Sequence, residues 1–183
     1  METKQSIRKQ IFRLRGQATD AQVHSDSLII LDRLTETDAY KNARQVFTYV
    51  DFNHEVETHD LILRCMADGK EVAVPRVREK DMDFYRLTDF AQLEPGYFGI
   101  PEPARGEIVT WEKALMVVPG VAFDPDCHRV GYGQGFYDRY LSIHRRHPAI
   151  ALAFAFQIVE AAPWEVTDIL PDMVITEKTI YRR

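Results

Sequence analysis

The sequence is that of an α/β protein: a single domain of three layers, with helices on both sides of a largely parallel central sheet. Short apolar runs typical of buried strands, such as "QVFTYV", "EVAVP", "ALMVVPG" and "AIALAF", alternate with stretches of helical periodicity. With 183 residues, 45% of them hydrophobic, the chain can bury one sizeable core but is short for two. We therefore expect one domain over residues 1–183.

Composition and charge exclude several classes of protein. The formal net charge is −5, whereas broad coating of DNA or RNA needs a strong basic excess. No apolar run approaches the roughly 20 residues of a membrane-spanning helix, and the N-terminal stretch lacks the features of a signal peptide. The two cysteines, Cys65 and Cys127, lie far apart in unlike contexts, which favours free thiols in a reducing cytoplasm. We expect a cytoplasmic protein that binds neither nucleic acid nor membrane.

The first 35 residues show the apolar spacing of two amphipathic helices. In the first, from Thr3 to about Arg15, apolar residues recur at spacings of four and three, and the other faces are basic. Gly16 ends this helix, and Thr19 or Asp20 can cap the second. The apolar residues of the two helices are Ile7, Ile11, Leu14, Val23, Ile30, Leu31 and Leu34.

A strand, a helix and a second strand follow. The run from Gln45 to Val50 is rich in β-branched and aromatic residues, as buried strands are. The loop "DFNHE" leads to a helix from Thr58 to Ala67, and Gly69 stands where a left-handed C-terminal cap is expected. The strand "EVAVP" comes next, and we expect its proline to end it.

The middle of the chain, residues 76–113, is less regular than the rest. The segment "MDFYRL" alternates like an exposed or edge strand, and "EPGYFGIPEPARG" is dense enough in proline and glycine to predict a loop. Beyond it, "ALMVVPG" is a buried strand, and "FYDRYLSIHRRH" is a helix with Phe136, Tyr140 and Ile143 on one face. "AIALAF" and "DMVIT" complete the predicted strands.

Residues 129–140, "RVGYGQGFYDRY", place three glycines at every second position between a strand, Leu115 to Val118, and a helix that begins near Gly135. Glycines there let main-chain N–H groups approach an anion, and the helix N-terminus adds unpaired donors and a positive dipole end. The spacing matches neither GxGxxG nor GK[ST]. The segment therefore fits a phosphate cradle or a tight structural turn whose glycines adopt positive φ.

Charged residues near this segment and at the N-terminus are open to two interpretations. Asp138 lies in the first turn of the helix, where it either caps N–H groups or faces a divalent cation that accompanies a polyphosphate. Lys4 and Arg8, four residues apart, project from one helix face. They form either a grip for phosphates or a solvated basic face.

Four separated segments of the chain carry a family resemblance. They are "KQSIR" at the N-terminus, "HEVET", "VPGVAFDPDCHRVGYGQGFYDRYL", and the tail "DILPDMVITEK". In this order, and over nearly the whole chain, they resemble the 5-formyltetrahydrofolate cyclo-ligases, also called 5,10-methenyltetrahydrofolate synthetases. The resemblance implies a monomeric enzyme that uses ATP and Mg²⁺ to convert 5-formyltetrahydrofolate to 5,10-methenyltetrahydrofolate.

The resemblance assigns ATP contacts to two stretches of this chain. Lys4 and Arg8 match the family's N-terminal nucleotide contacts, and the stretch from Arg129 to Tyr137 matches its ATP loop. Arg129, Tyr137 and Asp138 are thereby implied to be catalytic. The implied ATP-binding residues are Lys4, Gln5, Ser6, Ile7, Arg8, Arg129, Val130, Gly131, Tyr132, Gly133, Gln134, Gly135, Phe136 and Tyr137.

The resemblance also implies a magnesium site. Asp138 corresponds to one ligand, and order and spacing place a second at Asp168 rather than Asp172. A zinc site is disfavoured on the residues alone, because Cys127 and His128 adjoin one another and the chain has neither CxxC nor HxxxH spacing.

Folate contacts are implied for the loop after the first strand and for the glycine-rich segment. The implied residues are Val50, Glu55, Tyr132, Gly133, Gln134, Gly135 and Phe136. Without the resemblance, Glu55 is equally an acid that caps the helix at Thr58. Tyr97 and Phe98 either stack on the pterin or aminobenzoyl ring, or anchor their own loop.

The chain departs from the family pattern at three positions. Cys127 stands where glycine is usual, Gln134 where glycine or lysine is frequent, and Phe136 where tyrosine is frequent. Cys127 bears on the turn before Arg129, and Gln134 removes a cation from the phosphate region. Two other functions stay open on the same scaffold: an enzyme for another phosphate-bearing small molecule, and a non-catalytic binder of nucleotide or folate.

Overall fold

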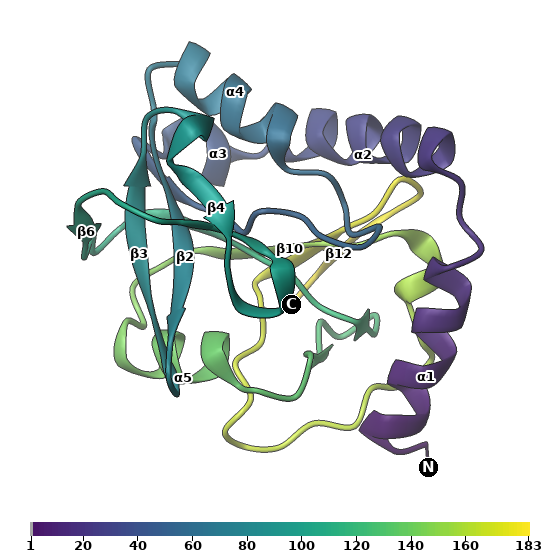
Figure 1. Cartoon of the computed structure of the whole chain (residues 1–183). Helices are drawn as coiled ribbons and strands as arrows, with labels where there is room; N and C mark the ends of the chain where they lie inside the picture. The colour runs from purple at the N-terminus through teal and green to yellow at the C-terminus, as the bar shows by residue number, and fades with distance from the viewer. Residues whose placement is uncertain (1) are drawn as a thin grey trace.

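The fold is built on one mixed sheet of eight strands. A computed structural model describes residues 2–183, and in it the sheet has the order β12-β11-β10-β7-β1-β2-β3-β6 (Figure 1). The five inner strands, from β11 to β2, run parallel, and β12, β3 and β6 are antiparallel to their neighbours. The strands are β1 (Gln45–Phe47), β2 (Glu71–Arg78), β3 (Asp81–Leu87), β6 (Ile108–Val109), β7 (Leu115–Val118), β10 (Ala149–Leu152), β11 (Met173–Ile175) and β12 (Ile180–Arg182).

Helices cover both faces of this sheet and one of its ends. In Figure 1, α2 and α4 lie above the sheet, α5 lies below it, and α1 stands beside it near the N-terminus. The predicted three-layer α/β architecture is confirmed. The α-helices are α1 (Lys4–Arg15), α2 (Asp20–Thr35), α3 (Asp38–Asn42), α4 (His59–Ala67) and α5 (Phe136–Ile143), and the 3₁₀ helices are η1 (Phe90–Gln92), η2 (Tyr97–Gly99) and η3 (Ala155–Gln157).

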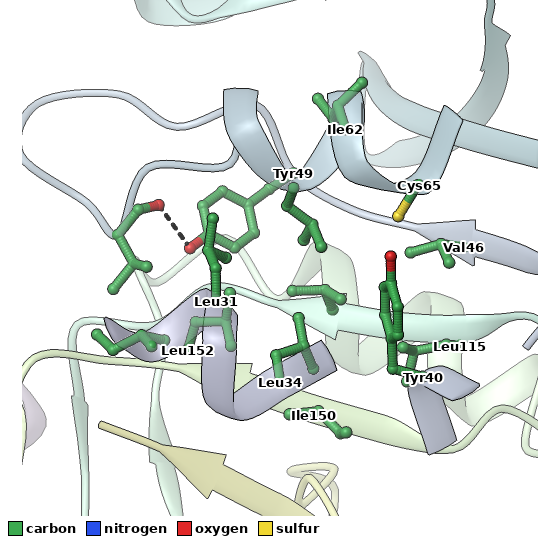
Figure 2. Close-up of a cluster of buried hydrophobic side chains, with 14 of the residues drawn as sticks. Leu31, Leu34, Tyr40, Val46, Tyr49, Ile62, Cys65, Leu115, Ile150 and Leu152 are labelled. Carbon is green, nitrogen blue, oxygen red and sulfur yellow. Dashed lines mark hydrogen bonds between the residues drawn. The ribbon is translucent and has the colours of Figure 1, made fainter. Parts of the chain in front are cut away.

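Alternation along the inner strands divides the core into two layers. In β10, Ile150 and Leu152 face the cluster covered by α2, α3 and α4, and Ala149 and Ala151 face the α5 side. Figure 2 shows the first layer, where side chains from α2 and α4 meet those of β1, β7 and β10. Each layer buries apolar surface that neither the helices nor the sheet could bury alone.

The order of the parallel strands creates a switch point between β1 and β7. From β1 the chain passes through α4 to β2 on one side, whereas β7, β10 and β11 follow one another on the other side. Ligands of open α/β sheets bind in the crevice outside the carboxyl ends of the strands at such a point. The segments that leave β1, β7 and β10 at this end of the sheet, together with α1 and the start of α5, form what we call the carboxyl edge.

The predicted strands differ from the observed ones around β1 and β2. The first strand stops before the expected Val50, and the second runs straight through Pro75. The main-chain carbonyl of Ala73 accepts a hydrogen bond from Thr48 N, so the main-chain polar groups of Ala73 face β1. Pro75 lies two residues further along β2, so its main-chain groups point in the same direction. Since β1 has ended by then, the N–H that proline lacks is not needed in the ladder.

Several short elements were not predicted. The Pro/Gly-rich segment is not all loop, because β4 (Leu93–Pro95) and β5 (Pro101–Pro103) pair as a two-stranded sheet. A second small sheet, β8 (Ala122–Phe123) with β9 (Arg129–Val130), precedes the glycines, and α3 and β12 were also missed. The predicted apolar face of α5 is wrong at Ile143, whose side chain is 77% exposed, and Leu141 packs inward instead. Within residues 2–183, no helix is both long and apolar enough to cross a bilayer.

Candidate active site

The glycine-rich segment forms a loop between β9 and α5, which we call the glycine loop, residues 131–135. Gly133 has φ of +103° and Gly135 has φ of +68°, so both occupy conformations that favour glycine. Among residues 2–183 no side chain caps α5 at Gly135, which leaves its first-turn N–H groups without a side-chain acceptor. The expectation of a positive-φ turn is confirmed at these two glycines, and the open helix end is what an anion site needs.

Helix α1 brings its basic residues to the glycine loop. Arg8 donates from Nε to the carbonyl of Gly131 at 2.8 Å, and its guanidinium carbon lies 3.7 Å from where a Cβ on Gly133 would stand. Lys4 Nζ lies 2.7 Å from Asp168 Oδ2 and 3.1 Å from Glu165 Oε1. Arg8 thus contacts a residue 123 positions away in the sequence, and Lys4, one turn earlier on the same helix, contacts one 164 positions away.

The other residues of the N-terminal motif differ in accessibility. Gln5 is exposed, and Ser6 exchanges hydrogen bonds with Thr3 in a capping box at the start of α1. Ile7 is fully buried in the cluster that α1 forms with β8 and β9, and Val130 is buried in the same cluster. The side chains of Ile7 and Val130 therefore position the two segments and do not face solvent.

The two predicted metal ligands lie in adjoining segments. Asp138 Oδ1 pairs with Arg129 Nη2 at 2.8 Å and accepts from the main chain N–H of Ile169 at 3.0 Å. Asp168, the preceding residue, uses Oδ2 for Lys4 and for Glu165 N. Among the described residues, the hydrogen bonds to these two carboxylates leave Asp138 Oδ2 and Asp168 Oδ1 free.

These free oxygens fit a magnesium ion that is held jointly with a nucleotide. Residues 2–183 contain no group of three His, Cys, Asp or Glu side chains that could enclose a metal by themselves. Magnesium at phosphate sites takes one or two carboxylates and completes its six ligands with water and phosphate oxygens. The donor set of Asp138 and Asp168 matches that mode.

Glu55 meets the glycine loop across the carboxyl edge. Its Oε1 accepts a short hydrogen bond from the Tyr132 hydroxyl, and its Oε2 accepts from Phe52 N at 3.0 Å. Desolvation by burial raises the pKa of Glu55, against the opposing effects of Tyr132 and of Arg15. The alternative interpretation of Glu55 as a helix cap is not what the contacts show, because Thr58 N donates to Asp51 instead.

Arg15 is a site residue that sequence reasoning missed. It is 3% exposed, donates from Nη1 to the Tyr132 hydroxyl at 2.8 Å, and reaches the carbonyl of Gly120 at 3.4 Å. Its guanidinium carbon lies 5.8 Å from the ring centroids of both Phe12 and Tyr132. The available signal was its spacing, four residues after Ile11, which places an arginine on the apolar stripe of α1.

Aromatic side chains line the far end of the glycine loop. Tyr97 meets Phe136 edge-on at 6.3 Å between ring centroids, and Phe98, 75% exposed, adopts a left-handed φ of 55° beside Tyr97. The Gln134 carbonyl accepts from Arg139 Nη1 at 2.7 Å. The contact of Tyr97 with Phe136 places η2 beside the start of α5, so the Pro/Gly-rich segment adjoins the site.

Two further predicted residues lie deeper. The Tyr137 hydroxyl is buried without a hydrogen-bond partner among the described residues, and burial together with the charge of Glu55 raises its pKa well above the ordinary range. Val50 is half-buried and packs against the core cluster under α2. Tyr137 therefore offers an unused polar group at the site, whereas the side chain of Val50 belongs chiefly to the core.

Asp124 is a second residue that sequence reasoning missed. Its buried carboxylate accepts from the main chain of Asp126, His128 and Ala162 and lies 2.9 Å from His128 Nδ1. It thereby joins the β8–β9 turn to the segment that leads toward Asp168. The run "FDPDC" signalled a turn but not its partner 38 residues away.

Comparison with known proteins shows the family to which the chain is related. Residues 1–177 match the family model described as the 5-formyltetrahydrofolate cyclo-ligase family. A probable 5-formyltetrahydrofolate cyclo-ligase of Caenorhabditis elegans is 30% identical over 96% of this chain and 93% of its own, and the 5-formyltetrahydrofolate cyclo-ligase of Mus musculus is 29% identical over 90% and 88%. The solved structure of Aquifex aeolicus 5,10-methenyltetrahydrofolate synthetase superposes with a TM-score of 0.86 at 31% identity, covering 98% of this chain and 92% of that one.

Proposed function

Because the chain belongs to the 5-formyltetrahydrofolate cyclo-ligase family, we propose that it closes 5-formyltetrahydrofolate to 5,10-methenyltetrahydrofolate at the expense of ATP. The products are ADP and phosphate. The observation that carries the proposal is the meeting of both ends of the chain at the glycine loop, where Lys4, Arg8 and Asp168 gather. A polyphosphate needs cations, main-chain donors and a metal-binding carboxylate in one place, and this site offers all three.

ATP is proposed to lie with its phosphates on the glycine loop and against α1. The open N-terminus of α5 supplies main-chain donors, and Lys4 and Arg8 supply positive charge. Lys4 already neutralises Asp168, and Arg129 neutralises Asp138, so cations and anions in the site are balanced before the nucleotide arrives. A bound magnesium ion, held by Asp138 and Asp168, would neutralise phosphate charge as it develops.

The folate is proposed to bind between Glu55 and the glycine loop. The pterin ring carries an amino group and a neighbouring ring N–H. A carboxylate such as that of Glu55 can accept a hydrogen bond from each of them through its two oxygens. Tyr97 meets Phe136 edge-on, and Phe98 lies beside Tyr97, so flat apolar rings of the substrate can stack there. We include the main chain around Val50 and the loop from Tyr132 to Phe136 in this subsite.

The proposed reaction activates a poor leaving group. The formyl oxygen attacks the γ-phosphorus, the bond to the β-phosphate oxygen breaks, and ADP leaves. N10 then attacks the formyl carbon and gives up its proton, and the C–O bond breaks with release of phosphate, which carries away the oxygen and can take up that proton. No side chain needs to act as a nucleophile, so the residues contribute position and charge: Arg129 holds Asp138 in place, and the Tyr137 hydroxyl is free to bond the reacting region.

The experiment is to mix the protein with 5-formyltetrahydrofolate and Mg-ATP and to follow the absorbance of the methenyl product. We expect product formation by the wild type and a fall of at least about 100-fold in kcat for Asp168→Asn. Asp172→Asn is the matched control, because Asp172 bonds Ala149 N at the opposite, amino end of β10 and the asparagine oxygen can keep that bond.

The outcomes separate the candidate functions. ATP binding without product would support a non-catalytic binder, and loss of turnover in both variants would show that Asp168 has no special role. We further propose that the enzyme is a cytoplasmic monomer acting on a small molecule and not on nucleic acid, which its acidic charge and its two buried free cysteines favour.

A further inference from the structure

The hydrogen bonds from Arg15 to Glu55 run in one direction. A guanidinium has donors and no acceptor, so the Tyr132 oxygen must accept from Arg15 Nη1. The single hydroxyl hydrogen of Tyr132 is then free for Glu55 Oε1, which accepts it. The chain of donors therefore ends on the carboxylate and matches its ionised form.

The charge of Arg15 is compensated along this chain. No carboxylate among the described residues forms an ion pair with Arg15, which is 3% exposed, and its Nε has no hydrogen-bond partner. A buried charge is costly unless it is paired and hydrogen-bonded. Its route to a negative charge is through the Tyr132 hydroxyl to Glu55. Arg15 and Glu55 line the crevice at the switch point between β1 and β7, and the Tyr132 hydroxyl joins them.

We propose that Arg15 is a positioning residue for the folate substrate: through the Tyr132 hydroxyl it holds Glu55 ionised and oriented at the carboxyl edge. The inference rests on the proposed function, in which Glu55 accepts from the pterin. It adds that the pH range of folate binding is set by an arginine that does not touch the substrate. It also means that Tyr132 connects the glycine loop to the loop after β1, which carries Glu55.

Several opposing influences act on the pKa of Glu55, and the charge of Arg15 is one of those that keep Glu55 ionised. Desolvation raises the pKa of Glu55, the Tyr132 hydroxyl, the Arg15 charge and the Phe52 N–H lower it, and Asp51 raises it. The titratable or charged groups that face Glu55 are Arg15, Tyr49, Asp51, Tyr132 and Tyr137. Removal of Arg15 takes away one of the effects that lower the pKa of Glu55, so the effect of desolvation raises it further. The carboxyl group then takes up a proton at a higher pH and loses acceptor capacity for the pterin.

The test compares Arg15→Met with Arg13→Met, a control on the exposed side of the same helix turn. The KM for 5-formyltetrahydrofolate and for ATP is measured from pH 5.5 to 8.5. We expect Arg15→Met to raise the folate KM about threefold or more at the acid end, with the rise fading toward alkaline pH, and to leave the ATP KM unchanged. Arg13→Met should follow the wild type throughout.

A second readout needs no substrate. In protein labelled with carbon-13 at glutamate carboxyl groups, the Glu55 resonance is identified by its loss in Glu55→Gln, and its titration midpoint should rise in Arg15→Met. Tyr132→Phe keeps the Arg15 charge but removes the hydrogen bond to Glu55, the larger of the two lowering effects, so the Glu55 midpoint should also rise in this variant. If Arg15→Met does not fold, Tyr132→Phe still tests the proposal.

An unchanged midpoint in both variants overturns the proposal, and so does a shifted midpoint with an unchanged folate KM across the pH range. Failure of the proposed function is distinguishable from either. In that case the wild type gives no product, while the titration still decides whether Arg15 controls the ionisation of Glu55.

Discussion

The apolar cluster beneath α2 and α4 and the carboxyl edge are held together by different forces. In the cluster, the side chains of Leu31, Leu34 and Ile150 are almost completely buried among other apolar side chains (Figure 2). At the carboxyl edge, the contacts are charged and directional, such as Lys4 with Asp168 and Arg129 with Asp138. The first region gains free energy from removing surface from water, and the second from specific partners at fixed distances.

This difference separates stability from activity. Burial in the cluster acts in every state of the folded protein, whether or not a ligand is bound. Lys4 and Asp168 are partly open to water, so we expect their ion pair to contribute little to stability. In the proposed function, such pairs keep charges in place for a polyphosphate. The contrast holds only if changes in the cluster lower stability and spare turnover, while changes at the edge do the reverse.

The largest expected effect on stability comes from Leu31→Ala. Leu31 is 0% exposed in the centre of the cluster, so truncation removes buried surface and leaves a cavity. We expect the free energy of unfolding in urea to fall by about 2–5 kcal/mol. The kcat of the remaining folded enzyme should be unchanged, because Leu31 lies in the apolar cluster beneath α2 and α4 and not at the glycine loop.

Leu63→Ala is the matched control, since Leu63 lies on α4 but is 46% exposed. Its expected change in unfolding free energy is within about 0.5 kcal/mol. Equal losses from the two truncations would show that burial in the cluster is not what stabilises the fold.

Glu55→Gln should have a smaller effect, of the opposite sign. Because desolvation raises the pKa of Glu55 in the folded protein, its charge opposes folding. The wild type therefore loses some unfolding free energy as the pH rises from the unfolded value of about 4.3 through the folded pKa. The glutamine variant has no such loss, so its advantage should grow across that interval and then level off.

Urea titrations at several values of pH between 4 and 8 measure this difference. Glu94→Gln, at an exposed position, is the control and should show no comparable pH dependence. A Glu55→Gln variant less stable than the wild type at every pH would mean that the carboxylate holds the edge together, as a core residue would. A gain in stability would show that the charge is kept for function.

The same contrast explains what could be predicted from the sequence. The helix α1 was found because Ile7 and Ile11 recur at helical spacing, and the inner strands because their apolar runs are continuous. Such patterns are local. The bond between Glu55 and Tyr132 joins residues 77 positions apart and has no periodic signal. Arg15 was not singled out, although its spacing from Ile11 puts it on the buried side of its helix.

The proline and glycine content of one segment gave a wrong prediction of its conformation. The prolines and glycines of the segment around Tyr97 predicted a loop, yet β4 and β5 pair across it. Two of the paired positions, Pro95 with Pro101 and Leu93 with Pro103, tolerate proline because this two-stranded sheet has no further strand to bond. The resemblance to a family, rather than periodicity, is what singled out the residues that the edge brings together.

The smallest expected effect on stability belongs to Lys4→Met. Burial lowers the pKa of Lys4, but its hydrogen bonds to Asp168 and Glu165 outweigh that effect and raise it. The stabilisation is therefore fully present below the unfolded value of about 10.4 and disappears as the pH rises through the folded pKa. Because the pair is partly open to water, we expect a loss at pH 7 of about 1 kcal/mol or less in urea denaturation.

The same variant should raise the KM for ATP about tenfold or more, since the proposed phosphate contact and the partner of Asp168 disappear together. Lys9→Met, at an exposed position on the same helix, is the control and should change neither quantity. If Lys4→Met instead lost several kcal/mol and kept its ATP affinity, the carboxyl edge would be stabilised in the manner of the cluster. The proposed separation of stability from activity would then be wrong at the residue where it is most sharply stated.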